Sequence, residues 1–203
     1  MPISSKHSCV FVHVPRTGGT TVEKLLGIHR EWPDPHTDVF HGRWEIEGDT
    51  LQLQHLPYPE MQVIADLAFT REYFKFSFVR NPWDRLVSEY FWLAQQHRVA
   101  FEDFVSRAES IVRARTRIRG ENCHFRPQSD FLSDDLDFVG RFENLEHDLH
   151  IVLDRLGVAY QAIPRHAGTQ HARYTSLYEG ALAERVADIY AQDIALLGYE
   201  FGR

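Results

Sequence analysis

The 203-residue sequence contains only two cysteines, and this scarcity excludes a cysteine-based metal site and a disulfide-stabilised scaffold. Cys9 and Cys123 do not have the spacing of metal ligands, and two cysteines do not make a disulfide framework. No apolar run approaches the ~18–20 residues that a membrane-spanning helix needs. The N-terminal stretch MPISSKHS also lacks the apolar core of a signal peptide. We therefore expect a cytoplasmic protein, in a reducing compartment, with no membrane span.

Positive charge is also scarce. The chain has 22 Lys and Arg against 29 Asp and Glu, which gives a net charge of −7 at pH 7. Such a surface repels nucleic acid and anionic membranes, so we expect neither as a partner, and a basic site must be built locally from particular arginines. None of the twelve histidines forms a pair at helical or hairpin ligand spacing with a third partner, so we expect no metal.

The pattern of apolar residues predicts an α/β fold. Residues 9–14 and 73–79 are rich in β-branched and aromatic side chains, as in buried strands. Residues 51–54 and 137–140 predict shorter strands, residues 28–50 an irregular segment, and residues 160–176 a loop. Helices are expected at 20–27, 59–67, 82–94, 101–118, 145–156 and 182–197. This alternation predicts one domain, residues 1–203, with a three-layer, P-loop-like fold whose central parallel sheet is flanked by helices.

Both strong strands lead directly into turns that carry an arginine. Pro15-Arg16 follows the first strand, and Arg80-Asn81 follows the second, where Asn81 can cap a helix that begins at Pro82. In open parallel sheets, ligands bind at the carboxyl ends of the strands. We therefore expect Arg16 and Arg80 to lie at the same edge of the sheet.

The turn after the first strand has the composition of an anion-binding loop. Its two glycines permit backbone conformations in which successive amides point at one group of oxygens, while its threonines add hydroxyls and its arginine adds a cation. The alternative is a tight strand–helix turn with a solvated arginine. The residues of the expected loop are Arg16, Thr17, Gly18, Gly19, Thr20 and Thr21.

ATP is a poor match for this loop. A Walker loop places four residues between its glycines and then continues Gly-Lys-Ser/Thr. Here Gly18 and Gly19 are adjacent, and no lysine precedes the helix. A carboxylate for magnesium is also missing where Val79 leads into Arg80. A P-loop small-molecule kinase therefore remains only an alternative.

The stretch FVHVPRTGGTT resembles the 5′-phosphosulfate-binding loop of sulfotransferases that use 3′-phosphoadenosine 5′-phosphosulfate (PAPS). KFSFVRNPWDRLVSEYFWL resembles their 3′-phosphate-binding segment, which has an Arg at a strand end and a Ser eight residues later. FRPQSDFL, FVGRFENLEHDL and DIALLGYEF are similar to further segments of the carbohydrate group (Golgi-type, sulfotransferase family 2). The resemblance spans roughly residues 9–201 and implies sulfuryl transfer from PAPS to a hydroxyl, with a carbohydrate as the expected acceptor.

The resemblance also implies a role for each matching residue. Arg16 and the amides of residues 17–20 would bind the 5′-phosphosulfate, and Arg16 would stabilise charge on the leaving oxygen without a metal. Arg80 and Ser88 would bind the 3′-phosphate. The group usually has Lys at position 16, and Arg keeps the charge but does not readily give up a proton. The alternatives are a salt bridge with Asp84 for Arg80 and an ordinary helix serine for Ser88.

His55 is the expected catalytic base, because LQHLP resembles the segment that carries a base in similar enzymes, and an imidazole suits the role. The alternative is a surface loop histidine. His13 is a rival that we expect to be packed or hydrogen-bonded. His36, His41 and His124 are weaker candidates. If no base is in place, the chain is a catalytically silent nucleotide-binding module.

Contacts with the acceptor are predicted for Arg113, Arg126 and Gln128. Arg113 opens a basic run with Arg115, Arg117 and Arg119, for which the alternative is a solvated face paired with Glu109 and Glu121. The loop 165–174, with Arg173 and Tyr174, is predicted to close over the nucleotide.

Overall fold

The computed structural model describes residues 2–29, 32–33, 43–46, 49–64, 68–94, 99–114, 120–160 and 173–203. Its central sheet has four strands in the order β1-β2-β7-β8. The strands are β1 (Ile3–Ser4), β2 (Cys9–Val12), β7 (Phe74–Val79) and β8 (Phe138–Arg141). β2, β7 and β8 are parallel, which confirms the predicted sheet, whereas the two-residue edge strand β1 is antiparallel to β2 and was not predicted.

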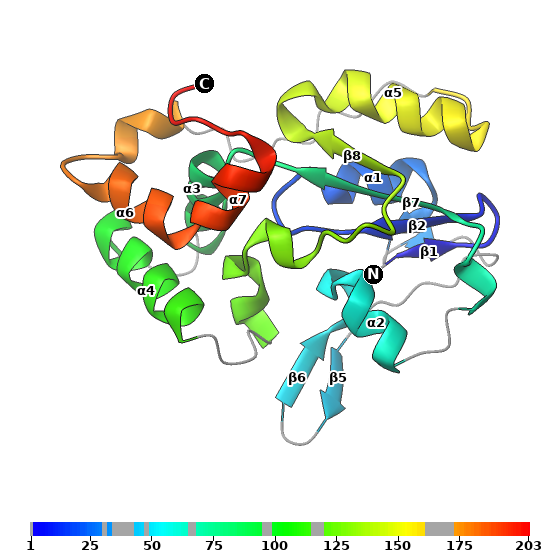
Figure 1. Cartoon of the computed structure of the whole chain (residues 1–203), viewed down its shortest axis with the longest axis horizontal. Coiled ribbons are helices and arrows are strands. Elements are labelled where there is room, and N and C mark those ends of the chain that lie inside the picture. Colours follow the sequence, from blue (N-terminus) through cyan, green and yellow to red (C-terminus); the bar gives the residue numbers. More distant parts are fainter. Residues whose placement is uncertain are drawn as a thin grey trace.

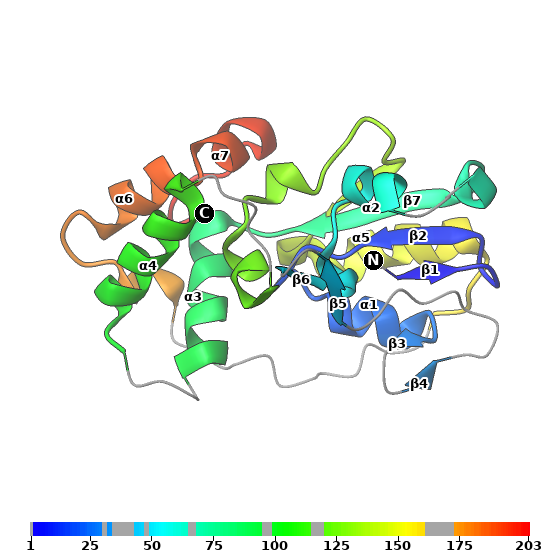
Figure 2. The same ribbon diagram turned by 90° about the horizontal axis from the view of Figure 1, so that it is seen from below.

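Helices cover both faces of the sheet. α1 (Gly19–Leu25) and α5 (Leu145–Leu156) pack on one face, and α2 (Tyr58–Ile64) packs on the other (Figures 1 and 2). The first face buries Phe11, Phe76, Phe78, Leu149 and Val152, and the second buries Val10, Val12, Met61 and Phe131. The predicted three-layer arrangement is therefore confirmed.

A group of helices lies beyond the carboxyl end of β7 (Figure 1). It comprises α3 (Pro82–Ala94), α4 (Phe101–Arg113), α6 (Leu182–Ile189) and α7 (Ala191–Leu197). The apolar stripe of α3, with Trp83, Leu86 and Val87, packs against this group. The predicted cap is confirmed, because the main-chain N–H of Trp83 donates to Asn81 Oδ1 at 3.1 Å.

Several element boundaries differ from the prediction. The helix expected over 182–197 is interrupted at Tyr190, whose buried hydroxyl donates to the Phe125 carbonyl at 3.0 Å. Tyr190 fits the apolar stripe, so periodicity did not reveal the break. The strand expected at 51–54 is β6 (Asp49–Gln52), and the 3₁₀ turn η1 (Leu53–His55) follows it.

The segment 28–50, expected to be irregular, contains short strands. These are β3 (Ile28–His29), β4 (Trp32–Pro33) and β5 (Arg43–Ile46), which pairs with β6. Among the described residues, no helix has the length and apolar character needed to cross a membrane. His36, His41, Arg115, Arg117, Arg119 and most of the loop 165–174 lie outside the described residues.

Candidate functional site

The two arginines expected at one edge of the sheet are in direct contact. Arg80 Nη1 donates to the main-chain carbonyl of Arg16 at 3.1 Å. Arg80 Nε also pairs with Asp84 at 2.8 Å, and its guanidinium stacks over Phe142, 4.0 Å from the ring centroid. The Asp84 salt bridge therefore exists, but Nη2 of Arg80 has no hydrogen-bond partner among the described residues. One nitrogen of this buried guanidinium remains available for an anion.

The turn between β2 and α1 is strained and tightly packed. Arg16 has φ +69° and Gly18 has φ +86°, and a positive φ is uncommon for a residue other than glycine. A Cβ on Gly19 would overlap the imidazole of His13. The main-chain N–H groups of residues 17–20 have no backbone acceptor among the described residues. They are therefore available to an anion that approaches the turn.

The side chains of this loop divide between support and exposure. Thr17 is fully buried, and its hydroxyl donates to the Val14 carbonyl at 2.8 Å, so it supports the turn. Thr20 is exposed and Thr21 is half-buried, so both can meet a ligand.

Arg16 reaches across to α3. Its Nε and Nη2 donate to the Ser88 hydroxyl at 3.2 and 3.1 Å, and its Nε lies 3.8 Å from Glu89 Oε2. The guanidinium also lies over Trp92, 5.6 Å from the ring centroid. Burial lowers the pKa of Arg16, and the carboxylate of Glu89 opposes this effect. The residues predicted for the two ends of the nucleotide therefore already touch one another.

His55 is fixed with one nitrogen available. Its Nδ1–H donates to the main-chain carbonyl of His13 at 3.1 Å, which places the lone pair on Nε2. Its ring contacts those of His13 and His124, with centroids 4.6 and 5.0 Å away. Burial, followed by the neighbouring His13 and His124, holds the pKa of His55 well below its usual value. His55 is therefore neutral near pH 7 and able to accept a proton.

The rival His13 is buried and hydrogen-bonded, as expected. Its Nδ1 lies 2.6 Å from Glu23 Oε1, and Gln54 donates to both oxygens of Glu23 at 2.8 and 3.0 Å. These contacts fix the ring behind the glycine turn, and its carbonyl orients His55.

Sequence reasoning missed Glu89 and underrated His124. His124 Nδ1 lies 2.9 Å from Glu89 Oε2, and its ring stacks on Trp92. A signal was present in the sequence, because Arg85, Ser88, Glu89 and Trp92 follow the i, i+3, i+4, i+7 spacing of one helix face. That face of α3 is turned to the site, opposite the apolar stripe.

The predicted acceptor contacts are mostly engaged within the protein. Gln128 is fully buried, and its amide both accepts from the Arg80 N–H at 2.9 Å and donates to the Arg80 carbonyl at 2.8 Å. It supports Arg80, and this geometry does not favour an acceptor contact. Arg126 pairs with Glu60 at 2.6 Å and with Asp130 at 3.1 Å.

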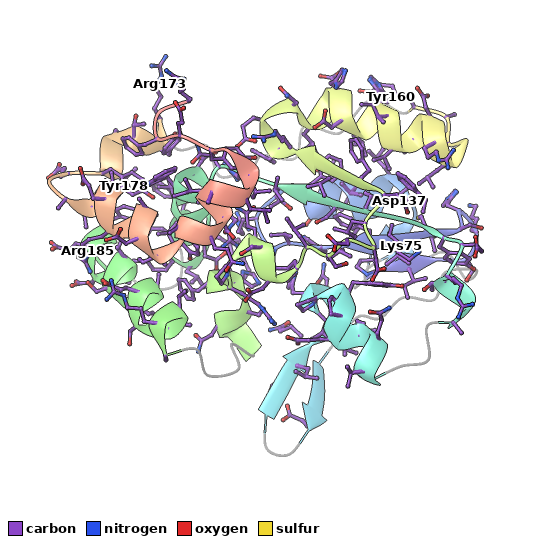
Figure 3. All side chains as sticks on the ribbon, viewed as in Figure 1. Lys75, Asp137, Tyr160, Arg173, Tyr178 and Arg185 are labelled. Atoms are coloured by element: carbon purple, nitrogen blue, oxygen red, sulfur yellow. The ribbon has the colours of Figure 1, made fainter. Side chains whose placement is uncertain are left out.

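Three further predicted site residues are Arg113, Arg173 and Tyr174, and the side chains of the first and the last have contacts within the protein. The exposed Arg113 pairs with Glu109 at 2.8 Å, as a solvated helix face would. Arg173 is exposed and projects away from the molecule in Figure 3. The Tyr174 hydroxyl accepts from the Gly202 N–H at 2.7 Å and from Asn81 Nδ2 at 3.4 Å, so it ties the C-terminal residues to the turn after β7.

Within the described residues, no group of three or more His, Cys, Asp and Glu side chains could hold a metal ion. The described part of the site brings together two neighbouring arginines, a turn whose N–H groups have no backbone acceptor there, and two histidines whose rings are in contact. This arrangement can bind an anionic group and accept a proton beside it.

Comparisons with known proteins agree with this arrangement. The model of the sulfotransferase family matches residues 1–200. Mouse carbohydrate sulfotransferase 11 is 21% identical over 238 aligned residues, which cover 97% of this chain and 66% of the mouse protein. The chain thus spans slightly less than two thirds of the length of this relative. No solved structure gives a significant match. The protein whose arginines and glycine turn are described above belongs to the sulfotransferase family.

Proposed function

We propose that the protein transfers the sulfuryl group of PAPS to a hydroxyl of a carbohydrate, by in-line displacement without a metal. The observation that carries the proposal is the direct contact between Arg16 and Arg80, beside a turn whose main-chain N–H groups have no backbone acceptor among the described residues. One nucleotide with an anionic group at each end can bridge two such neighbouring arginines. The carbohydrate acceptor is proposed because the mouse relative is named as a carbohydrate sulfotransferase.

The residues present fit PAPS as the co-substrate. The turn amides and Arg16 offer donors for the 5′-phosphosulfate, and Nη2 of Arg80 and the Ser88 hydroxyl offer donors for the 3′-phosphate. PAPS would supply the sulfuryl group and the leaving phosphate oxygen. The Ser88 oxygen accepts from Arg16, and its own O–H can be donated to the phosphate at the same time.

The protein's own groups then provide charge stabilisation and proton transfer. Arg16 stabilises the negative charge that develops on the leaving oxygen. His55 accepts the proton of the acceptor hydroxyl on Nε2, because its Nδ1 is held by the His13 carbonyl. Contacts with the substrates stay predictions for five further residues, Arg113, Arg126, Gln128, Arg173 and Tyr174. The cytoplasmic location also stays a prediction.

Isothermal calorimetry with 3′-phosphoadenosine 5′-phosphate (PAP) tests the nucleotide site. We expect PAP to bind at least tenfold more tightly than AMP or ATP, a difference of about 1.4 kcal/mol. Arg80→Ala should remove this preference, while Arg113→Ala serves as a surface control. Equal affinity for PAP and AMP in the unaltered protein would overturn the assignment of Arg80 and Ser88.

The variant His55→Ala separates a transferase from a silent nucleotide-binding module. We expect turnover of PAPS to fall by about 10²–10⁴-fold, the usual contribution of a general base, while PAP affinity stays within twofold. His150→Ala, on the outer helix α5, is the matched control. Unchanged turnover in His55→Ala would show that the base is another group.

A further inference from the structure

The carboxylate of Glu89 is buried beside the proposed base and is incompletely satisfied. Its residue is 2% exposed, and Oε2 faces His124 Nδ1 at 2.9 Å. Oε1 has no hydrogen-bond partner among the described residues. A buried charge is costly unless it is fully paired, so its retention calls for a functional explanation.

Glu89 fixes the tautomer of His124. With the carboxylate at Nδ1, the proton lies on Nδ1 and the lone pair lies on Nε2. The ring is also held by stacking on Trp92, with centroids 5.3 Å apart, and by edge contact with His55, with centroids 5.0 Å apart. Nε2 of His124 has no hydrogen-bond partner among the described residues. Within the described part of the chain, Nε2 of both His55 and His124 therefore lacks a hydrogen-bond partner, and the two rings are in edge contact.

The two imidazoles differ in the partner of their Nδ1 atoms, which is a carbonyl for His55 and a carboxylate for His124. His55 is set against the His13 carbonyl, and burial and the neighbouring histidines hold its pKa well below its usual value. Two rings in contact can share one positive charge far more easily than they can hold two. Glu89 Oε2 lies 2.9 Å from Nδ1 of His124, so a proton received by this ring has a carboxylate partner on its other side. The titratable and charged groups around the pair are Arg16, His13, Arg85, Glu89, Cys123 and Arg126.

We propose that the proton taken from the acceptor hydroxyl by His55 is passed to Nε2 of His124, where the buried carboxylate of Glu89 stabilises it. This rests on the proposed sulfuryl transfer. The hydroxyl oxygen forms the new bond to sulfur with its own electron pair, and the bond from sulfur to the phosphate oxygen breaks with its pair on that oxygen. Among the described residues no hydrogen bond joins the two rings, which meet edge to face, so the proton moves from oxygen to His55 Nε2 and then through one bridging water molecule to His124 Nε2. His55 returns to its neutral state, and Glu89 acts as a positioning residue.

Transfer of labelled sulfuryl from PAPS to unsulfated polysaccharides and nitrophenyl pyranosides tests the relay. We expect Glu89→Gln and His124→Gln each to lower kcat by about 10–100-fold, as loss of partners behind a functional histidine does. The double variant should be no slower than His124→Gln alone, because the two groups act as a unit. His147→Gln is the matched control, since it removes an exposed pair with Asp148 at 3.0 Å and should leave kcat unchanged.

Two measurements on Glu89→Gln, PAP affinity and the pH dependence of kcat, test whether the variant acts indirectly through Arg16. Glu89 lies 3.8 Å from Arg16 Nε, so a loss of PAP affinity equal to the loss of kcat in Glu89→Gln would overturn the relay. We expect PAP affinity to stay within twofold. Without the carboxylate the protonated relay is less stable, so the acid limb of kcat should move to lower pH while its plateau falls. An unchanged limb and plateau would also overturn the proposal.

Nuclear magnetic resonance of the histidine rings, in the PAP complex, tests the pair without turnover. We expect a strongly deshielded Nδ1 proton on His124 that disappears in Glu89→Gln. A His124 tautomer protonated on Nε2 would overturn the relay, even if the enzyme is active. Conversely, a failure of the unaltered enzyme to transfer sulfuryl to any probe, with the expected tautomer present, would overturn the proposed function rather than the assignment of this pair.

Discussion

Arg16 is the residue whose contacts must change most during the proposed reaction. In the structure it donates to the Ser88 hydroxyl, while its own carbonyl accepts from Arg80. Its backbone has a positive φ, which costs about 1–3 kcal/mol for a non-glycine residue. The fold thus holds the main chain of Arg16 in a fixed, strained turn, while the long side chain can move between Ser88 and the turn amides.

The lowered pKa of His55 gives a pH prediction. A base works only when it is unprotonated, so activity is lost as the pH falls through its pKa. Because that pKa lies well below 6.5, we expect the plateau of kcat/KM to extend below pH 6.5. In the unfolded chain His55 takes up a proton at higher pH than in the native protein, so stability also declines as the pH falls below 6.5.

The pH–rate profile and thermal melts between pH 5 and 8 check both effects. The variant His55→Gln should lose the part of the acid destabilisation that comes from this ring, and His147→Gln should not. An acid limb of kcat/KM at or above 6.5 would contradict the assignment of His55 as the base.

Among single residues, the positions of those that directly follow a strand could be predicted from the sequence. The hydrogen-bond partners of the site residues could not. Arg16 and Arg80 could be placed together because parallel strands end at one edge. His55 was identified through resemblance, and its orientation depends on the carbonyl of His13, which is 42 residues away in the sequence. Contacts over such separations, like that of Glu89 with His124, are decided by packing and not by local pattern.

Among the elements, α3 (Pro82–Ala94) organises the site. One face is apolar and packs on α4 and α6, and the other carries the polar Arg85, Ser88 and Glu89 together with the aromatic Trp92. Its first turn is fixed by Asn81, so the polar face has a defined rotation relative to β7. The helix therefore links the position of Arg80 to those of the groups that contact Arg16 and His124.

A second element, α7, supports Arg80 indirectly, through Gln128. This chain of contacts gives a stability prediction. Asp193 is fully buried, and its oxygens accept the N–H groups of Gln128 and Ser129, both at 2.8 Å. Gln128 in turn binds both main-chain groups of Arg80. We expect Asp193→Asn to cost about 2–3 kcal/mol, because two charge-assisted hydrogen bonds are weakened and an amide NH₂ faces an N–H.

The melting temperature of Asp193→Asn should fall by about 5–10 °C, measured by calorimetry. PAP affinity should fall as well, since the support of Arg80 is loosened. Asp188→Asn, on the exposed side of α6, is the matched control, with an expected change within about 0.5 kcal/mol. A stable variant with intact PAP affinity would contradict this chain of contacts.

The elements themselves were predictable where apolar periodicity was strong. β2, β7, α3 and α5 follow the expected ranges, and the stop of α5 at Gly157 matches its left-handed conformation, with φ +65°. The break at Tyr190 and the two-residue strand β1 were missed. Both depend on tertiary hydrogen bonds, which are invisible in a single stretch of sequence.

In the whole molecule, the site lies where the sheet meets the helical group. The turn after β2 and the start of α3 approach each other there, and the C-terminal residues close over Asn81 through Tyr174 and the carbonyls of Glu200 and Arg203. A ligand that bridges Arg16 and Arg80 would therefore couple the two halves of the fold. The two turns that meet here, at Arg16 and Arg80, are 64 residues apart in the sequence. Because unfolding would separate them, a ligand that binds both should stabilise the whole fold.

This coupling predicts a large and specific stabilisation by PAP. At a concentration of 100 times Kd, a ligand that binds only the native state adds about 2.7 kcal/mol. For a chain of this size we expect the melting temperature to rise by about 5–10 °C. AMP, which lacks the 3′-phosphate, should produce a clearly smaller shift at the same concentration. Arg80→Ala should reduce the PAP shift to the AMP value.

Chelation decides between this chemistry and a magnesium-dependent kinase. Because the arginines supply the positive charge, the PAP shift and the sulfuryl transfer should be unchanged by an excess of EDTA. A kinase would hold its nucleotide through magnesium and carboxylates, so EDTA would abolish both nucleotide stabilisation and turnover. An EDTA-sensitive shift that magnesium restores, with ATP preferred to PAP, would show that the two arginines serve a different nucleotide chemistry.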